Sequence, residues 1–416
     1  IKQSINDQIP ILIDNLEYYE DKTNNHLLSN IKAIFLFSVF FKEKSYFNLC
    51  NEVFDFIINH IFYKSGFLNE GSSHYHLLIS KHVIEILYFN EIYNDNILSN
   101  KHIKFFKKVL SNIHIFSVTN NLVNFGDSTP DLPIQYLKSL TYISNKVIKI
   151  NYPVFYEESN FSCKNYSNLF KINNIRVPKV RDLKYSFYDK ESGYVFISNN
   201  NIKIYLQLRN SNIIKSRTHQ HTEIGNFILY YKNKMIFNDL GRKNYNKNSI
   251  LSLGSNYHNS FKINNLEPLL CHKLNSIPSM MHQNYFQKKP EFIFTEEQDK
   301  FKINIKFFGY ERFHFKSVIE RNFDILENHI IESKKQVKFN SYFHTSLNII
   351  KKDNIYNLFE NDSNLCQLKI LDNNTFSIIK QNVSFNEYSI NQKINSILIS
   401  KKLQKKDNIK YIIKFN

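Results

Sequence analysis

The stretch Arg217-Thr218-His219-Gln220-His221-Thr222-Glu223-Ile224-Gly225 precedes the clearest pair of strand-like runs in the chain. An apolar run from Phe227 to Tyr231 is followed by the polar break Lys232-Asn233-Lys234 and by a second apolar run from Met235 to Phe237. Two such runs joined by a short polar break predict a β-hairpin. The chain around this hairpin is therefore expected to fold as antiparallel sheet.

Histidines and an aspartate flank the predicted hairpin. Side chains at i and i+2 of an extended segment share one side, so His219 and His221 are expected together at the open end, near Asp239. His258, within Tyr257-His258-Asn259, follows a short distance along the chain. A single histidine on a β-strand is usually a packing residue. Two histidines with an aspartate can instead complete a three-ligand metal site that leaves a fourth position for water or substrate.

Length and composition indicate a large globular protein. A chain of 416 residues, 42% hydrophobic and 15% aromatic, can bury a sizeable core and predicts two domains. Its net charge of +17 attracts polyanions, whether nucleic acid, anionic lipid or acidic polysaccharide, and charge alone does not choose among them. No apolar run approaches the roughly 20 residues of a membrane span.

The cysteines bear on zinc and disulfide frameworks, and the first residue bears on processing. Four cysteines are scattered without a CxxC pair, which indicates neither a zinc ribbon nor a dense disulfide framework. Because the sequence opens at Ile1 rather than Met, we expect it to be processed or a fragment.

The first part of the chain, residues 1–145, has helical periodicity. From Asn24 the apolar positions Leu27, Ile31, Ile34 and Phe35 recur at helical spacing, and Asn24 or Asn25 is the expected N-cap. Further helices are expected at about 47–61, 74–89, 102–115 and 132–143. Short polar connections between them predict antiparallel helical hairpins.

Beyond about residue 145 the helical pattern ends. Residues 146–185 contain Pro153 and Pro178 and are expected to be a crossing segment between domains. Residues 186–416 follow a period of two, which predicts an antiparallel β-sandwich. Its expected strands include residues 194–197, 202–206, 301–307 and 411–413.

Several motifs, taken in order, resemble the heparinase II/III-like polysaccharide lyases. Asn25-His26-Leu27-Leu28-Ser29-Asn30 is similar to the N-H-L-L-x-N helix start of that family, and Glu70-Gly71-Ser72-Ser73-His74-Tyr75-His76 is similar to its E-x-S-x-x-Y-H. The other matching motifs are Asn124-Phe125-Gly126-Asp127-Ser128, His219-Gln220-His221-Thr222-Glu223, Asp239-Leu240-Gly241, Tyr245, His258-Asn259-Ser260, His314 and His344. The chain departs from the family at Glu223, where an Asp is usual, and at Leu253-Gly254-Ser255, which stands in place of Arg-Ser-Thr.

The resemblance implies a fold and a reaction. The fold is an (α/α) toroid-type helical domain followed by an antiparallel β-sandwich, with the first helices of the toroid expected in a segment before Ile1. The reaction is β-elimination on a uronic-acid-containing acidic polysaccharide. It requires a neutralised carboxylate, a base for the C5 proton and an acid for the departing oxygen.

The resemblance also implies the residues that carry this chemistry. Tyr75 is the expected catalytic tyrosine, with Asn25 as a carboxylate donor and His26 and His219 as proton-handling or carboxylate-binding groups. Tyr245 is a further catalytic candidate. Glu70, His76, Arg217 and Tyr257 are expected around the substrate. Glu70 is expected either to orient a neighbour or to cap the next helix, and His76 to support Tyr75.

A metal, a partner and a location follow from the same resemblance. His221, Asp239 and His258 are expected to bind a largely structural Zn²⁺, consistent with mixed nitrogen and oxygen ligands. The expected partner is the acidic polysaccharide, with no nucleic acid, and the expected location is the periplasm or the cell envelope. No pattern in the sequence indicates an oligomeric state.

Alternative functions remain open at this point. HxH on a strand also begins the cupin pattern. A cupin would carry its Glu about four residues beyond the second His, whereas Glu223 comes two residues beyond it. A cupin fold also does not include a helical first half. A non-catalytic binder of acidic glycans on the same scaffold is the second alternative. Nucleic-acid binding is favoured only by charge, without a motif or a basic arm.

Overall fold

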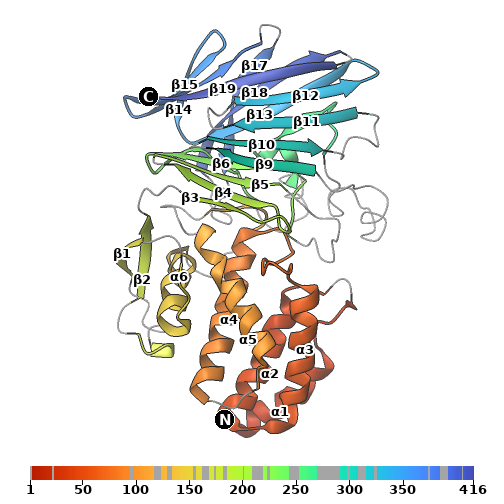
Figure 1. Ribbon diagram of the computed structural model, residues 1–416, viewed down its shortest axis with the longest axis vertical. Helices are drawn as coiled ribbons and strands as arrows, with labels where there is room; N and C mark the ends of the chain where they lie inside the picture. Colours follow the sequence, from red (N-terminus) through yellow and green to blue (C-terminus); the bar gives the residue numbers. More distant parts are fainter. Residues whose placement is uncertain are drawn as a thin grey trace. The chain divides into compact units, whose positions relative to one another are not determined.

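The computed structural model separates into two compact units (Figure 1). The helical unit comprises Ile1–Asn124, Thr129–Arg181 and Ile214–His219, and the sheet unit comprises Phe125–Ser128, Asp182–Ile213 and Gln220–Asn416. The structure describes residues 2–20, 23–93, 97–116, 123–128, 134–152, 156–161, 168–172, 175–180, 185–199, 201–208, 219–222, 225–242, 253–268, 291–297, 300–307, 315–322, 326–372, 375–384, 392–404 and 406–416.

The helical unit confirms the helices expected from periodicity. Helices α2, α3, α4 and α5 pack on one another, and α6 packs on α4 (Figure 1). A two-stranded antiparallel sheet of β1 and β2 lies in the range expected to be a crossing segment. The elements are α1 (Lys2–Asp14), α2 (His26–Phe41), η2 (Lys44–Tyr46), α3 (Phe47–His60), α4 (Ser73–Tyr93), α5 (Asn100–Ser111), η3 (Ile113–Phe116), α6 (Ile134–Ile148), β1 (Tyr156–Phe161) and β2 (Ile175–Val180).

Helix α2 begins in a way that only partly follows the sequence prediction. Asn24 Oδ1 accepts a hydrogen bond from the His26 backbone N–H at 2.9 Å, as a capping side chain does. Asn25 is not the cap, because its backbone is already helical and its side chain makes no capping hydrogen bond. The amide of Asn25 is therefore available for another role. Further along the helix, buried Ser38 donates to the carbonyl of Ile34 at 2.8 Å, which satisfies the one polar group on the apolar face.

A buried charge cluster joins α2 to α4. The Glu85 carboxylate forms ion pairs with Lys32 and Lys81, with Oε2 2.7 Å from Lys32 Nζ and Oε1 3.0 Å from Lys81 Nζ. All three side chains are largely buried. His82 lies beside them, with its Nδ1 2.8 Å from Lys32 Nζ. Burial alone would raise the pKa of Glu85, but His82 and the two lysine charges outweigh it and lower the pKa to about 2. Glu85 is therefore an ionised partner that both lysines need.

The described residues of the sheet unit form three antiparallel sheets with the strand orders β14-β15-β16-β19-β12-β11-β10-β9, β17-β18-β13-β8 and β3-β4-β5-β6-β7. The expected order of a helical domain followed by an antiparallel β domain is thus confirmed. The strands are β3 (Tyr185–Tyr188), β4 (Tyr194–Asn199), β5 (Ile202–Gln207), β6 (Asn226–Tyr231), β7 (Lys234–Phe237), β8 (Phe261–Ile263), β9 (Glu291–Glu297), β10 (Lys300–Phe307), β11 (Phe315–Asn322), β12 (Leu326–Ser333), β13 (Val337–Thr345), β14 (Asn348–Lys352), β15 (Ile355–Glu360), β16 (Ser363–Ile370), β17 (Phe376–Ser384), β18 (Gln392–Leu403) and β19 (Lys406–Phe415).

The predicted hairpin is confirmed as β6 and β7, which pair antiparallel. Its turn residues Lys232 and Asn233 both have positive φ, 48° and 61°, as the tight turn between right-twisted strands requires. Phe227 and Leu229 of β6 face an apolar core that is shared with Phe343 of β13 and Tyr411 of β19. The three sheets therefore enclose one core, which fixes the loops at their ends.

The remaining sequence expectations concern cysteines and membrane helices. Cys50 and Cys366 are buried free thiols, and burial raises the pKa of each to about 12. Cys163 and Cys271 lie outside the described residues. Within the described ranges, no helix is long and apolar enough to cross a membrane.

Candidate active site

Glu70 is the centre of a buried polar cluster in the helical unit. Its carboxylate is fully buried and accepts the Asn25 backbone N–H at 2.6 Å and the Asn25 side-chain amide at 2.7 Å. These two bonds hold both the start of α2 and the amide plane of Asn25, an arrangement consistent with the predicted orienting role of Glu70. Glu70 itself is too buried to contact a substrate directly.

The loop between α3 and α4 holds Glu70 in place. The Asn69 backbone N–H donates to the Ile61 carbonyl at 3.0 Å, and Asn112, the residue that caps the C-terminus of α5, donates to the Ser65 carbonyl at 2.8 Å. Gly66 has φ +91°, and a Cβ at this position would lie 3.1 Å from backbone atoms of α5. Only glycine both adopts that φ and allows so close an approach to α5.

His219 completes the cluster with Tyr75. The His219 Nε2 atom lies 3.4 Å from Glu70 Oε2, and its ring stacks on that of Tyr75 with centroids 3.5 Å apart and 12° between planes. Tyr75 is on the first turn of α4 and is 8% exposed. Three of the catalytic candidates, Asn25, Tyr75 and His219, are therefore brought together around Glu70.

Two other predicted residues of the helical unit lie elsewhere. The exposed imidazole of His26 contacts Glu17 Oε2 at 2.7 Å rather than the Glu70 cluster. His76 is fully buried, and its Nδ1 accepts the Leu68 backbone N–H at 3.2 Å. Burial lowers the pKa of His76 to about 3, so it is a neutral packing residue. A fully buried His76 is consistent with the predicted supporting role beside Tyr75, and its predicted contact with substrate stays a prediction.

A second buried polar cluster lies in the sheet unit and consists of a row of charged groups. His258 Nδ1 lies 2.9 Å from both oxygens of Asp239, and its Nε2 lies 3.2 Å from His221 Nδ1. On its other side, His221 Nε2 lies 2.8 Å from Asp127 Oδ1. Arg242 donates to Asp127 Oδ2 at 2.7 Å. The row therefore runs Asp239, His258, His221, Asp127, Arg242.

The protons in this row can be counted. Each of the three contacts made by the two imidazoles needs one N–H, because ionised carboxylates only accept. Two neutral imidazoles supply two such protons, so a fully hydrogen-bonded row carries one additional proton. Burial is the largest single influence and would raise the pKa of Asp239, but the charges of His258 and His221, together with the hydrogen bonds from His258 and the Gly241 backbone, outweigh it and lower this pKa. Its carboxylate thus stays ionised and balances the imidazole charge.

His219 and His221 do not lie on the extended segment that the sequence pattern predicted. Residues 219–222 are turn and irregular backbone, so the period of two that applies to a strand does not apply here. His219 belongs to the helical unit and His221 to the sheet unit. The expected roles of the two histidines also differ, since His221 was predicted as a metal ligand and His219 as a reactive group.

The three-ligand zinc set expected from the sequence does not fit this arrangement. The Asp239 oxygens face the Nδ1 edge of His258, whereas the Nε2 edge faces His221, so the three residues do not direct donor atoms to a common point. Among the described residues there is no group of three or more His, Cys, Asp or Glu side chains that could hold a metal ion.

Sequence reasoning missed several residues that build the second cluster. Asp127 was noted only as part of a family-like loop, and Arg242 was not noted at all. Asn226 also escaped attention, although its side-chain amide donates to Asp239 Oδ2 and its Oδ1 accepts the Asn259 backbone N–H at 3.1 Å. A buried aspartate within a glycine-containing loop was the available signal for Asp127, whereas partners this distant in sequence have no spacing signal.

The remaining predicted residues are placed as follows. Arg217 and Tyr245, together with Glu223 and His314, lie outside the described residues. Tyr257 is half-buried in η5 (Ser255–Tyr257), and its carbonyl accepts the Leu240 N–H at 3.2 Å. The departure from the family at 253–255 has a structural role, because the Leu253 carbonyl accepts both the backbone N–H and the hydroxyl of Thr222 at 2.9 Å.

Solved structures share this fold. A heparan sulfate lyase mutant from Pedobacter heparinus matches 98% of this chain at 14% identity, with a TM-score of 0.74 and 62% of its own length covered. A heparinase III structure matches 98% of the chain at 15% identity, with a TM-score of 0.71 and 63% of its length covered. A chondroitin AC lyase mutant from Streptomyces coelicolor matches 96% of the chain at 6% identity, with a TM-score of 0.56 and 61% of its length covered.

The chain thus spans about three fifths of the length of these structures and has the fold of a heparinase-like lyase over nearly all of its own length. A comparison of the sequence with protein-family models finds no match, and neither does a comparison with curated proteins.

Proposed function

We propose that this chain belongs to a polysaccharide lyase that cleaves a uronic-acid-containing acidic polysaccharide by β-elimination. The observation that carries the proposal is the cluster of Asn25, Tyr75 and His219 around the buried Glu70. These four residues come from separate segments and supply an amide donor, a phenol and an imidazole at one place. The heparan sulfate lyase and chondroitin AC lyase folds give the proposal additional support.

Asn25 neutralises the substrate carboxylate in this proposal. Removal of the C5 proton places negative charge beside an existing carboxylate, so the group needs a fixed hydrogen-bond donor. An amide nitrogen carries two hydrogens, and Asn25 gives one to Glu70. The second is held in a set direction by that bond and can be donated to the carboxylate.

His219 and Tyr75 handle the two protons. In this proposal Nε2 of His219, which lies 3.4 Å from Glu70 Oε2, carries the proton of the neutral ring, so Nδ1 is the acceptor and takes the C5 proton. The Tyr75 hydroxyl gives its proton to the glycosidic oxygen as the C4–O bond breaks. The electron pair of the C5–H bond becomes the C4–C5 double bond. The products are a new reducing end and an unsaturated uronate end.

Ultraviolet absorbance tests the reaction directly. The C4–C5 double bond is conjugated to the carboxylate and absorbs, whereas a hydrolase produces no such group. We expect at least one polymer in a panel of alginate, heparin, heparan-type and chondroitin-type chains to give rising absorbance with the full-length protein. A protein that binds a panel member but never produces the unsaturated end would instead be a non-catalytic glycan binder.

Zinc is a separate proposal, and the residues of the row suggest how it would be held. His221 Nδ1 and His258 Nε2 lie 3.2 Å apart, close to the about 3.3–3.4 Å between two nitrogens bound to one tetrahedral zinc. The other nitrogen of each ring contacts a carboxylate, an arrangement that orients metal-binding histidines. We propose that His221 and His258 bind zinc and that Asp239 and Asp127 orient them. Bound there, the metal would serve to hold the loops of the sheet unit.

Zinc content of three proteins tests this assignment. Wild type purified without a histidine tag should contain about one zinc per chain, and His221→Ala should contain none. Asp239→Asn should retain the site with about 10- to 100-fold lower affinity, as expected for an orienting carboxylate. Loss of zinc from Asp239→Asn as complete as that from His221→Ala would make Asp239 a ligand, and a folded wild type without zinc would reject the metal.

A further inference from the structure

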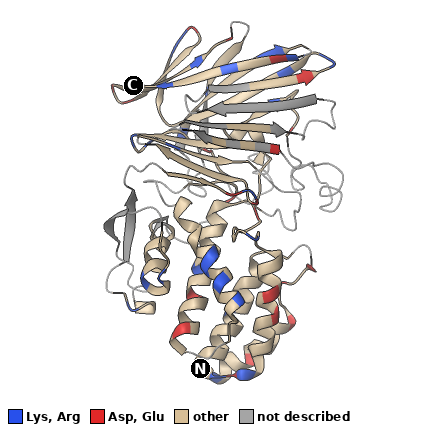
Figure 2. Ribbon diagram, viewed as in Figure 1, with Lys and Arg blue, Asp and Glu red and all other residues tan. Residues whose placement is uncertain are grey.

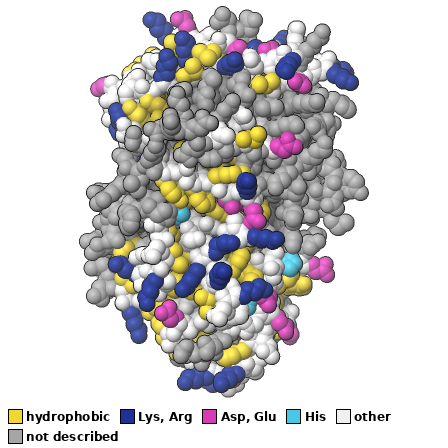
Figure 3. Space-filling model, in the orientation of Figure 1, with side chains coloured by type: hydrophobic (Ala, Val, Ile, Leu, Met, Phe, Trp, Pro, Cys, Tyr) yellow, Lys and Arg dark blue, Asp and Glu magenta, His cyan; other side chains and the backbone are white. Residues whose placement is uncertain are grey.

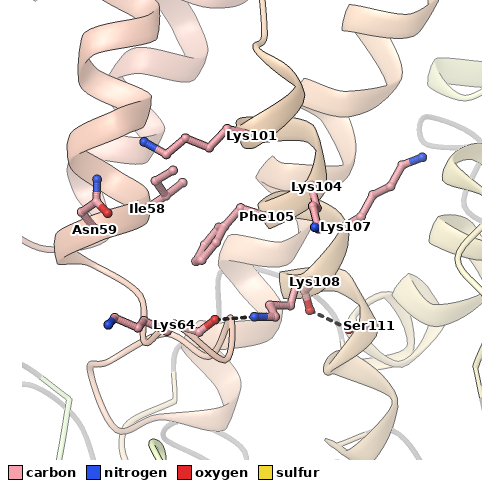
Figure 4. Close-up of a pocket in the computed structure, with 9 residues that line it drawn as sticks. All are labelled: Ile58, Asn59, Lys64, Lys101, Lys104, Phe105, Lys107, Lys108 and Ser111. Atoms are coloured by element: carbon pink, nitrogen blue, oxygen red, sulfur yellow. Dashed lines mark hydrogen bonds between the residues drawn. The ribbon is translucent and has the colours of Figure 1, made fainter.

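A basic pocket lies on the helical unit, between the end of α3 and the outer face of α5 (Figure 4). Its volume is about 750 Å³, within the about 300–1,000 Å³ of small-ligand sites. Five lysines line it, together with Ile58, Asn59, Phe105 and Ser111. It shares no residue with the Glu70 cluster or with the row of the sheet unit. The lysines are Lys64, Lys101, Lys104, Lys107 and Lys108.

The lysines follow from the amphipathic sequence of α5. Its buried face carries His102, Phe106, Val109 and Leu110, and its outer face carries lysines with no acidic residue anywhere in the helix. Figure 2 marks Lys and Arg as blue stretches of the helical ribbon, and Figure 3 shows Lys and Arg side chains spread over the visible face of the helical unit. A solvated surface accounts for scattered lysines, but not for lysines gathered around a pocket with an apolar wall.

Most of the lysine charge in the pocket is uncompensated. Lys101 is paired with Asp55 at 2.6 Å, and the Lys108 ammonium donates to the Lys64 carbonyl at 2.7 Å without losing its charge. Within the described ranges, no carboxylate pairs with Lys64, Lys104 or Lys107. Four positive charges therefore remain around one pocket after the contribution of Asp55 is subtracted, which favours an anionic occupant with several charges.

The wall of the pocket indicates what kind of polyanion fits. The half-buried ring of Phe105 is held edge-on by Phe62, with centroids 5.8 Å apart, and lies among the lysines beside Ile58 (Figure 4). A fixed aromatic face suits the C–H face of a sugar ring. The amide of Asn59 and the hydroxyl of Ser111 can bond sugar hydroxyls. The lining has no arginine, the residue that suits planar, bidentate recognition of phosphates and bases.

We propose that this pocket is a second binding site for an acidic polysaccharide, separate from the Glu70 cluster. The Phe105 ring stacks on one sugar unit, and Lys64, Lys104, Lys107 and Lys108 bind the carboxylates or sulfates of that unit and its neighbours. The identity of the polymer rests on the proposed lyase function. The site would retain a long chain on the protein between successive cleavages.

Direct binding tests the site without requiring turnover. Binding of heparin and alginate to the full-length protein should weaken about tenfold at low salt in the double variant Lys104→Gln/Lys107→Gln, and the difference should shrink as salt screens the charges. The matched control is Lys334→Gln/Lys335→Gln, which removes the same charge from an exposed turn of the sheet unit and should bind as wild type does. Phe105→Leu keeps an apolar wall and should weaken binding at low and high salt alike.

Three results would overturn the proposal. The first is unchanged heparin and alginate binding by both pocket variants. The second is an equal loss of binding in the control variant, which would mean that only net charge matters. The third is that the pocket variants lose binding to duplex DNA or to anionic phospholipid vesicles but still bind polysaccharide as wild type does. That result would assign the lysines to another partner. Dextran is the neutral control polysaccharide, and we expect it to bind neither to wild type nor to the variants.

Kinetics separates this proposal from the lyase proposal. If the protein is a lyase, Lys104→Gln/Lys107→Gln should raise KM for a long polymer and leave turnover of a short oligosaccharide unchanged. If no unsaturated product ever forms, the binding difference between the pocket variants and the control still decides whether the second site exists.

Discussion

Tyr75→Phe is expected to lower turnover by about 10²–10⁴-fold, the usual effect of losing a general acid or base. The substitution removes only the hydroxyl, so the ring can still stack on His219, whose ring centroid lies 3.5 Å away. Polysaccharide binding and thermal stability should therefore remain close to wild type. The measurement is the initial rate of absorbance increase on whichever polymer the wild type cleaves.

Tyr18→Phe is the matched control for this loss. Tyr18 is an exposed tyrosine of the same unit, and its ring contacts Phe56 rather than the Glu70 cluster. It should cleave at the wild-type rate. If Tyr75→Phe also retains wild-type turnover, the hydroxyl of Tyr75 is not the acid, and the proton must come from another group. Unchanged KM with reduced kcat would identify a role in the chemical step rather than in binding.

The second large effect is on stability. Glu85→Gln leaves Lys32 and Lys81 without their anion in a largely buried position, which should lower the free energy of unfolding by about 3–5 kcal/mol. The helical signal in circular dichroism, followed during denaturation by urea, measures this change. Glu91→Gln is the control, because it removes the same charge from an exposed position of the same helix. It should change stability by no more than about 0.5 kcal/mol.

The pH dependence of this effect has a defined sign. The folded-state pKa of Glu85, about 2, lies below its ordinary value of 4.5. The ionised form is therefore favoured by folding, and its contribution is fully present above about pH 4.5. As pH falls from about 4.5 to about 2, wild type should lose this contribution and approach Glu85→Gln in stability. A difference that stayed constant over this range would mean that the charge of Glu85 is not what stabilises the helices.

Local features of this fold could be predicted from sequence, because each depends on neighbours in the chain. The β6–β7 hairpin follows from two apolar runs and a polar break, and the helices follow from apolar spacing. The Glu70 cluster is different. Asn25, Glu70, Tyr75 and His219 were named only through family motifs, and nothing in their spacing indicates that Glu70 binds the Asn25 amide.

The metal prediction shows where pattern reasoning stops. It assumed that His219 and His221 are extended and therefore share a side, but the backbone there is a turn. It also treated Asp239 as a ligand, whereas the structure uses its oxygens to hold the Nδ1 of His258. Which edge of an imidazole faces which partner is decided by packing across the whole unit. Asp127, distant from His221 in sequence, sets the orientation of that ring.

The helical unit is completed by a segment that is synthesised late, after part of the sheet unit. Its last piece, Ile214–His219, is synthesised only after Asp182–Ile213 of the sheet unit has already emerged. During synthesis the helices can pack and Glu70 can bind Asn25 while the imidazole partner of Tyr75 does not yet exist. A fragment that ended at Arg181 would therefore lack His219. Such a fragment would report on stability but could not report on catalysis.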